Sequence, residues 1–383
     1  SLDANTEGDN NTAIGYNSLT ANTTGSSNTM VGYEAGKANT TGTGNTFMGF
    51  NAGVASTTTE YNAFFGAYSG ENTTTAERNA FFGGATGRLN TTGDRNTFIG
   101  RSAGYWNTTG SSNTFVGNAA GSLNATASYN VVIGDEAGQY LTSGENNSFV
   151  GYHAGWKNTT GTRNIAIGNN ALDAPDTEND NLAIGYDALG GAIDGGEFNV
   201  AIGNYSLDAN TAGDYNTAIG YNSLTGNTTG EKNSAFGHEA LKANTTGYKN
   251  TAGGFNSLTA NTTGVENTAM GHYALINNTT GSHNSAGGSG ALNNNTTGTD
   301  NTAFGRWALN DNTTAGYNTA VGYTALENAN RTADANAYNT AIGYNAGNTG
   351  TNDITTGDKN VLVGASTAAS AATASNQIVI GYG

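Results

Sequence analysis

The chain has 383 residues, of which 36% are hydrophobic and 11% charged, with 58 glycines, one proline and a net charge of −16. It has no cysteine, which excludes disulfides and thiolate metal sites. It also has no run of 18 apolar residues, so no membrane-spanning helix is predicted. The negative charge argues against a nucleic-acid partner, because phosphate binding needs a cationic surface.

One motif, Asn-x-Φ-Φ-Gly with Φ an apolar residue, recurs 22 times, in most copies every 17 residues. The first copy is Asn11 to Gly15, and only the last copy replaces the asparagine, with Gln377. A short fixed period indicates a unit that cannot bury its apolar face alone and stacks on its neighbours. We therefore predict an all-β parallel β-solenoid of about 22 coils with a 17-residue period. Residues 1–383 form one continuous repeat array, as a fragment of a longer fibre or a filament subunit.

Each copy contains the same predicted elements, counted from the asparagine as position 0. Positions 1 to 3 favour Thr, Ala, Val, Ile and Phe, which predicts a strand at 12–14, 29–31 and so on to 378–380. Glycine at position 4 permits a sharp corner. Asn-Thr-Thr-Gly at positions 11 to 14 has turn chemistry and is expected on the outside of the coil. Three insertions fall next to that side, at 190–196, 327–338 and 348–359, as outer loops tolerate.

Positions 2 and 8 exchange volume along the chain. From Met30 to Phe149 position 2 is large and position 8 is glycine, whereas the first copy (Ala13, Leu19) and every copy from Ala166 to Ala320 have alanine at position 2 and leucine at position 8. Close-packed interiors tolerate neither voids nor overfilling, so the two positions are predicted to share one space. Ala341 with Gly347 is the exception.

Position 3 is also apolar in nearly every copy. In an extended strand, positions 2 and 3 point to opposite faces, which leaves an apolar row outside the coil. Such a row indicates lateral association, with a trimer favoured. The alternative is a bulge that turns both residues inward.

The candidate functional residues form columns. Position 5 is often aromatic, and its tyrosines are candidate ligand-binding residues: Tyr16, Tyr33, Tyr152, Tyr186, Tyr221, Tyr323 and Tyr344. The repeated asparagines and glycines are interpreted as a structural amide ladder and its corners rather than a recognition stripe: Asn11, Gly15, Asn96, Gly100, Asn216, Gly220, Asn301 and Gly305. Asn-Thr-Thr triplets are possible glycosylation sites on exposed turns, or turn chemistry alone: Asn22, Asn39, Asn107, Asn158, Asn227, Asn244 and Asn261.

No catalytic or metal constellation stands out. The four histidines, His153, His238, His272 and His283, are scattered over the register, and we interpret them as surface residues. No nucleophile with a partner base and no phosphate-binding glycine loop is found, so a non-enzymatic protein without a cofactor is predicted.

The strand motif Asn216-Thr-Ala-Ile-Gly-Tyr221, followed by Ser-Leu, resembles the head repeats of trimeric autotransporter adhesins. It is also similar to repeats in phage tail-fibre proteins, although the adhesin heads use a coil shorter than 17 residues. The resemblance covers the whole chain and implies a left-handed parallel β-roll, a homotrimer and a role in binding surfaces.

The sequence thus favours a fibre shaft on the cell or virion surface, in a phage tail fibre or a bacterial adhesin, binding surfaces through many weak contacts such as glycans. The alternative is a structural subunit of an extracellular filament that stacks end to end, since the two chain ends are in phase.

Overall fold

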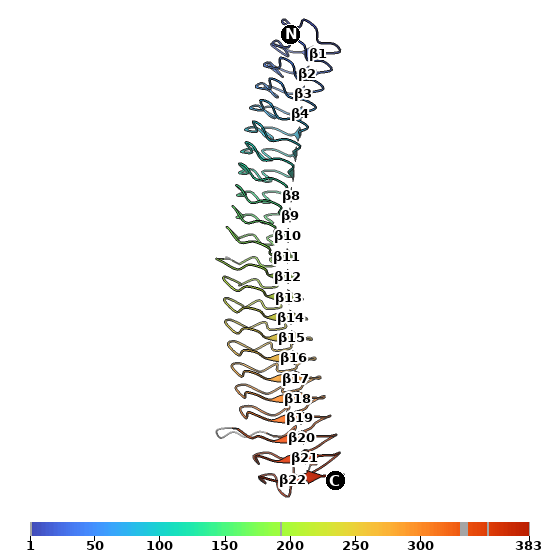
Figure 1. Ribbon diagram of the computed structural model, residues 1–383, viewed down its shortest axis with the longest axis vertical. Helices are drawn as coiled ribbons and strands as arrows, with labels where there is room; N and C mark the ends of the chain where they lie inside the picture. Colours follow the sequence, from blue (N-terminus) through green and yellow to red (C-terminus); the bar gives the residue numbers. More distant parts are fainter. Residues whose placement is uncertain (1, 192–193, 330–335, 351, 383) are drawn as a thin grey trace. The chain divides into compact units, whose positions relative to one another are not determined.

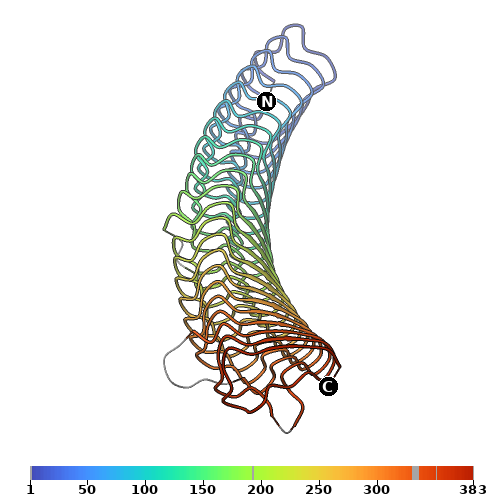
Figure 2. The same ribbon diagram turned by 60° about the horizontal axis from the view of Figure 1, so that its bottom comes forward.

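A computed structural model of the chain describes residues 2–191, 194–329, 336–350 and 352–382. It contains two compact units, Ser1–Asp194 and Gly195–Gly383, whose boundary falls within the insertion at 190–196. Each unit is a parallel β-solenoid with eleven strands (Figures 1 and 2). No helix occurs among the described residues. The predicted all-β solenoid with its 17-residue period is therefore confirmed.

In the first unit each strand has three residues, at positions 1 to 3 of its coil, and pairs in parallel with the strand one repeat away, as Thr12 does with Thr29. The strands are β1 (Thr12–Ile14), β2 (Thr29–Val31), β3 (Thr46–Met48), β4 (Ala63–Phe65), β5 (Ala80–Phe82), β6 (Thr97–Ile99), β7 (Thr114–Val116), β8 (Val131–Ile133), β9 (Ser148–Val150), β10 (Ile165–Ile167) and β11 (Leu182–Ile184).

The second unit repeats this arrangement, and its register is kept across the insertions, since Thr319 still pairs with Thr340. Its strands are β12 (Val200–Ile202), β13 (Thr217–Ile219), β14 (Ser234–Phe236), β15 (Thr251–Gly253), β16 (Thr268–Met270), β17 (Ser285–Gly287), β18 (Thr302–Phe304), β19 (Thr319–Val321), β20 (Thr340–Ile342), β21 (Val361–Val363) and β22 (Ile378–Ile380). Each insertion predicted as a loop includes residues outside the described part of the chain: 192–193, 330–335 and 351.

The core is a column of position 2 and position 8 side chains, as predicted. A Cβ on Gly36 would lie 2.7 Å from the sulfur of Met30, which already fills that space. The exception is also explained, because a Cβ on Gly347 would meet Leu326 at 2.8 Å and Leu362 at 3.0 Å. In that coil, side chains of the coils on either side fill the space that its own alanine and glycine leave.

The column is filled in two ways, and the change between them lies within the first unit, between Phe149 and Ala166. The first way is a stack of buried phenylalanines, Phe47, Phe64, Phe81, Phe98 and Phe115, whose ring centroids lie 4.6–4.9 Å apart. The second way is alanine at position 2 and leucine at position 8, both fully buried, as in Ala218 and Leu224. Leu224 has a φ of +53°, a left-handed conformation that is uncommon outside glycine. Burial of its side chain offsets this strain.

Candidate functional site

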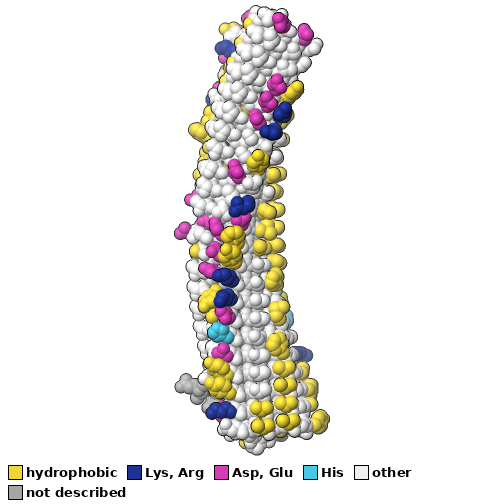
Figure 3. Space-filling view, in the orientation of Figure 1, with side chains coloured by type: hydrophobic (Ala, Val, Ile, Leu, Met, Phe, Trp, Pro, Cys, Tyr) yellow, Lys and Arg dark blue, Asp and Glu magenta, His cyan; other side chains and the backbone are white. Residues whose placement is uncertain are grey.

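The outward side of each sheet is an apolar row at position 3. Position 2 is buried in every strand except the end strands β1 and β22, where it is half-buried. Position 3 is exposed or half-buried in every strand, so the alternative in which a bulge turns both residues inward is wrong. Figure 3 shows hydrophobic side chains in columns that run from coil to coil in the second unit, in the lower part of the view. The exposed members are Ile14, Met48, Phe82, Ile99, Ile133 and Ile167 in the first unit, and Ile219, Phe236, Met270, Phe304, Val321, Ile342 and Ile380 in the second.

Two glycines at position 3 leave no gap in this row. A Cβ on Gly253 would meet the terminal methyl carbon of Met270 at 2.7 Å, and a Cβ on Gly287 would meet the ring of Phe304 at 2.4 Å. The side chain of the following coil therefore lies across each glycine. We call this set of position 3 residues the outer sheet row.

The candidate tyrosines at position 5 are all exposed, and several stack on the ring of the next coil. Tyr16 and Tyr33 stack at 5.3 Å between centroids, and Tyr323 and Tyr344 stack at 5.4 Å. Tyr221 begins a run of four stacked rings in the second unit, which continues through His238, Phe255 and His272.

One candidate tyrosine, Tyr152, has a ring partner in its own coil. Its ring stacks on that of His153, at 3.8 Å between ring centroids. Tyr186 is also exposed. The position 5 aromatics are therefore several short stacks rather than one uniform surface.

The repeated asparagines at position 0 form an internal ladder. The backbone N–H of Asn28 donates to Oδ1 of Asn11 at 3.0 Å, and Nδ2 of Asn11 donates to the carbonyl of Gly25 at 2.7 Å. Asn96, Asn216 and Asn301 are buried and make the same contacts. Their place inside the coil supports the structural interpretation and leaves no surface recognition stripe.

The position 4 glycines mark a close approach between coils. A Cβ on Gly15 would lie 2.3 Å from the carbonyl oxygen of Gly32 in the next coil, and its φ is +134°. Gly100, Gly220 and Gly305 show the same contact at 2.3 Å. Both the space and the conformation require glycine at this corner.

The asparagines of the Asn-Thr-Thr triplets are buried, so their predicted place on exposed turns is wrong. All seven have no solvent-exposed surface: Asn22, Asn39, Asn107, Asn158, Asn227, Asn244 and Asn261. They form a second ladder, in which Nδ2 of Asn22 donates both to Oδ1 of Asn5 at 2.8 Å and to the carbonyl of Gly25 at 2.9 Å. In the folded coil, the Nδ2 atom to which an N-linked glycan would be attached is therefore buried. The signal in the sequence was the recurrence of asparagine at position 11, which is less regular than at position 0.

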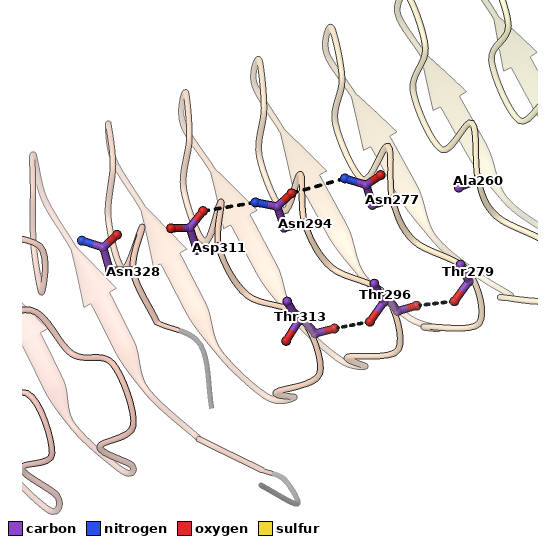
Figure 4. A pocket seen from close by; sticks show the side chains of 8 residues that line it. All are labelled: Ala260, Asn277, Thr279, Asn294, Thr296, Asp311, Thr313 and Asn328. Atoms are coloured by element: carbon purple, nitrogen blue, oxygen red, sulfur yellow. Dashed lines mark hydrogen bonds between the residues drawn. The ribbon is translucent and has the colours of Figure 1, made fainter. Parts of the chain in front are cut away.

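The surface between positions 10 and 12 forms a shallow groove, which sequence reasoning missed. In the second unit the groove has a volume of about 540 Å³ and is lined by Ala260, Asn277, Thr279, Asn294, Thr296, Asp311, Thr313 and Asn328 (Figure 4). Along one wall Nδ2 of Asn294 donates to Asp311 at 3.1 Å, and along the other the hydroxyl of Thr279 donates to the carbonyl of Thr296 at 3.0 Å. We call this feature the 10–12 groove.

Titratable side chains of neighbouring coils interact at two places in the first unit. Nε2 of His153 lies 3.0 Å from the carboxylate of Glu136. Burial, and secondly the carboxylate of Asp187, raise the pKa of the Asp173 carboxyl to about 6. Among the described residues no group of three or more His, Asp or Glu side chains is placed to hold a metal ion. A non-enzymatic role stays a prediction.

Fold and surface together define a β-solenoid repeat protein with an apolar outer sheet row and a longitudinal groove. No protein-family model and no curated protein matches the chain. In the part of the chain that the structure describes, no helix has the length and apolar character needed to cross a membrane.

Proposed function

We propose that this protein is a non-enzymatic segment of an extracellular or virion-surface fibre, of the kind found in phage tail fibres and bacterial adhesins. Its role is to extend the fibre and to bind surfaces through repeated weak contacts. The observation that carries the proposal is the repetition of the same outward apolar and aromatic side chains from coil to coil. Many identical weak contacts reach high total strength by avidity, so no single deep pocket is needed.

The outer sheet row is the proposed surface for association with further copies of the chain, as a homotrimer. A soluble protein rarely leaves a contiguous apolar surface in water. A second copy carries the same row with the same coil spacing, so side chains such as Phe236 and Phe304 can pack between those of the partner coil after coil.

The native mass of the chain tests this proposal. Light scattering is expected to give a discrete species near three times 38.8 kDa. A variant carrying Phe236→Ser, Met270→Ser and Phe304→Ser removes three exposed members of the outer sheet row and is expected to shift the species to a monomer. The matched control is Tyr215→Ser with Tyr317→Ser, because these aromatics are equally exposed but lie at position 16.

A monomer for the unmodified chain, or equal masses for the triple variant and the control, would overturn association through this row. Open-ended polymers that persist in the triple variant would support the second candidate function instead. In that case the protein is a filament subunit, whose copies join through their terminal coils.

A further inference from the structure

In the first unit, positions 9, 10 and 12 line a separate groove, which we also call part of the 10–12 groove. It has an aromatic wall where three successive coils depart from the repeat. Tyr140 and Lys157 occupy position 10, which is alanine in many copies, and Trp156 occupies position 9. In the third coil the Asn-Thr-Thr-Gly turn is replaced by Pro175, Asp176, Thr177 and Glu178. Pro175 is the only proline of the chain, and it takes the place of a ladder asparagine.

Tyr140 and Trp156 form an aromatic corner. Their ring centroids lie 5.4 Å apart with an angle of 84° between the planes. Two further contacts fix the orientation of the Trp156 indole. Its Nε1 donates to Gln139 at 2.9 Å, and its ring stacks on the ring of His153 at 4.8 Å between centroids. Tyr140 remains exposed beside it. A corner fixed in this way loses little conformational entropy when a ligand binds.

The rest of the groove presents hydrogen-bonding groups. The hydroxyl of Thr159 donates to the exposed carboxylate of Asp176, and the ammonium of Lys157 lies 5.4 Å from the centroid of the indole. The turn that carries Asp176 is rigid, because the buried carboxylate of Glu178 accepts from the backbone N–H of Asp176 at 2.8 Å.

We propose that this part of the 10–12 groove binds a neutral glycan, an extended chain of β-linked pyranose rings. The flat apolar face of a pyranose packs on an exposed aromatic ring, while its ring hydroxyls donate to a carboxylate and accept from an ammonium. Tyr140 and Trp156 supply the first kind of contact, and Asp176 and Lys157 supply the second. This inference rests on the proposed surface-binding function and names the site and the class of ligand.

The size and direction of the groove fit such a chain. Its volume of about 370 Å³, lined by Tyr140, Trp156, Lys157, Thr159, Ala174 and Asp176, lies at the lower end of the range for small-ligand sites. It crosses three coils along the direction in which they stack. Adjacent strands lie about 4.8 Å apart, a spacing close to the rise of successive rings in an extended β-linked chain. One carboxylate and one ammonium in the lining balance each other, which favours a neutral ligand over an anionic one.

Titration with defined oligosaccharides tests the site. Cellohexaose and chitohexaose are the β-linked probes, and maltohexaose, whose α-linked backbone is coiled, is the comparison sugar. The full chain with Trp106→Phe and Trp307→Phe retains Trp156 as its only tryptophan, so indole fluorescence reports this groove. A saturable fluorescence change at millimolar concentration is expected for at least one β-linked probe, and none for maltohexaose. Tyr140→Ser and Asp176→Asn are each expected to weaken binding at least tenfold.

The matched control is Tyr129→Ser, which removes an aromatic ring at position 16 that is more exposed than that of Tyr140. All three variants change exposed side chains, and circular dichroism verifies their fold. Absence of binding by both β-linked probes, or equal affinity of Tyr140→Ser and Tyr129→Ser, would overturn the site. Such a result leaves the native mass of the chain untouched, so failure of the groove and failure of the proposed self-association are separate outcomes.

Discussion

The second asparagine ladder is broken at a few coils, and the breaks predict where the fold can be stabilised. At three breaks the preceding asparagine has a buried Oδ1 atom without a hydrogen-bond partner among the described residues. These are Ser56 after Asn39, Pro175 after Asn158, and Ala329 after Asn312. At a fourth break, Leu141, Oδ1 of Asn124 accepts instead from the backbone N–H of Ala127 at 2.9 Å.

The substitution Ser56→Asn repairs one break. Ser56 is fully buried, and its own hydroxyl also lacks a partner among the described residues. An asparagine there would place Nδ2 against Oδ1 of Asn39 and the carbonyl of Thr59, as the other rungs do. Its own Oδ1 would face Thr73 at position 11 of the next coil, whose buried hydroxyl has no partner among the described residues and can donate to it. Satisfying a buried acceptor is worth about 1–3 kcal/mol, and the added side chain costs part of this in lost rotamer freedom. We expect the local free energy of unfolding to rise by about 1–2 kcal/mol.

Hydrogen exchange is the suitable assay, because repeat arrays unfold locally rather than in one step. Amides of the two coils joined by the new rung, residues 28–61, are expected to exchange about 5- to 30-fold more slowly, the factor that 1–2 kcal/mol gives. Ser56→Ala is the control, since it removes the hydroxyl without adding a rung, and its exchange is expected to stay near that of the unmodified chain. Equal protection in both variants, or faster exchange in Ser56→Asn, would refute the ladder as a source of stability.

Two further predictions concern the core and pH. Met30→Ala is expected to destabilise by about 2–5 kcal/mol and Gly36→Leu by about 1–3 kcal/mol, but the double variant by only about 1 kcal/mol, because it recreates the packing of Ala13 with Leu19. Hydrogen exchange of the amides around residues 30–36 in all three variants measures this, and additive losses would contradict the shared space. Because the pKa of Asp173 is raised to about 6 from an ordinary value near 3.8, the folded chain binds the proton more tightly, and stability falls as pH rises from about 4 to 6. Asp173→Asn is expected to flatten that fall and to add about 1–2 kcal/mol at pH 7, allowing for solvent screening of a half-buried group. Hydrogen exchange of the amides around Asp173 at pH 4 to 7, corrected for the intrinsic pH dependence of exchange, checks this, and a loss of protection at pH 7 in the variant would contradict it.

The solenoid could be predicted from the sequence because its determinants are local and repeated. Every coil repeats the same residue pattern. A strand at positions 1 to 3, a glycine corner and the exchange of side-chain volume between positions 2 and 8, as at Met30 and Gly36, can therefore be identified without tertiary information. Alternation along a three-residue strand also favoured an outward direction for Ile219 once Ala218 is inside. The alternative of a bulge between the two positions was excluded only by the structure.

The second ladder and the groove could not be predicted in the same way. Asn-Thr-Thr-Gly has the composition of an exposed turn, and composition does not show that Asn22 points inward to a carbonyl already used by Asn11. That geometry depends on how the coil closes across residues far apart in the repeat. The groove likewise depends on side chains from three coils, so Tyr140, Trp156 and Asp176 looked like unrelated departures from the pattern.

The shared space of positions 2 and 8 also constrains how such a chain can change over generations. Passing from a phenylalanine with glycine to an alanine with leucine requires two simultaneous substitutions, because either one alone leaves a void or a clash. Copying a whole coil avoids that barrier, since each copy carries both partners with it. This accounts for the arrangement of the chain in blocks. The pairing of a large residue with glycine is uninterrupted from Met30 to Phe149, and the pairing of alanine with leucine is uninterrupted from Ala166 to Ala320. The array lengthens by duplication more readily than any one of its coils can drift.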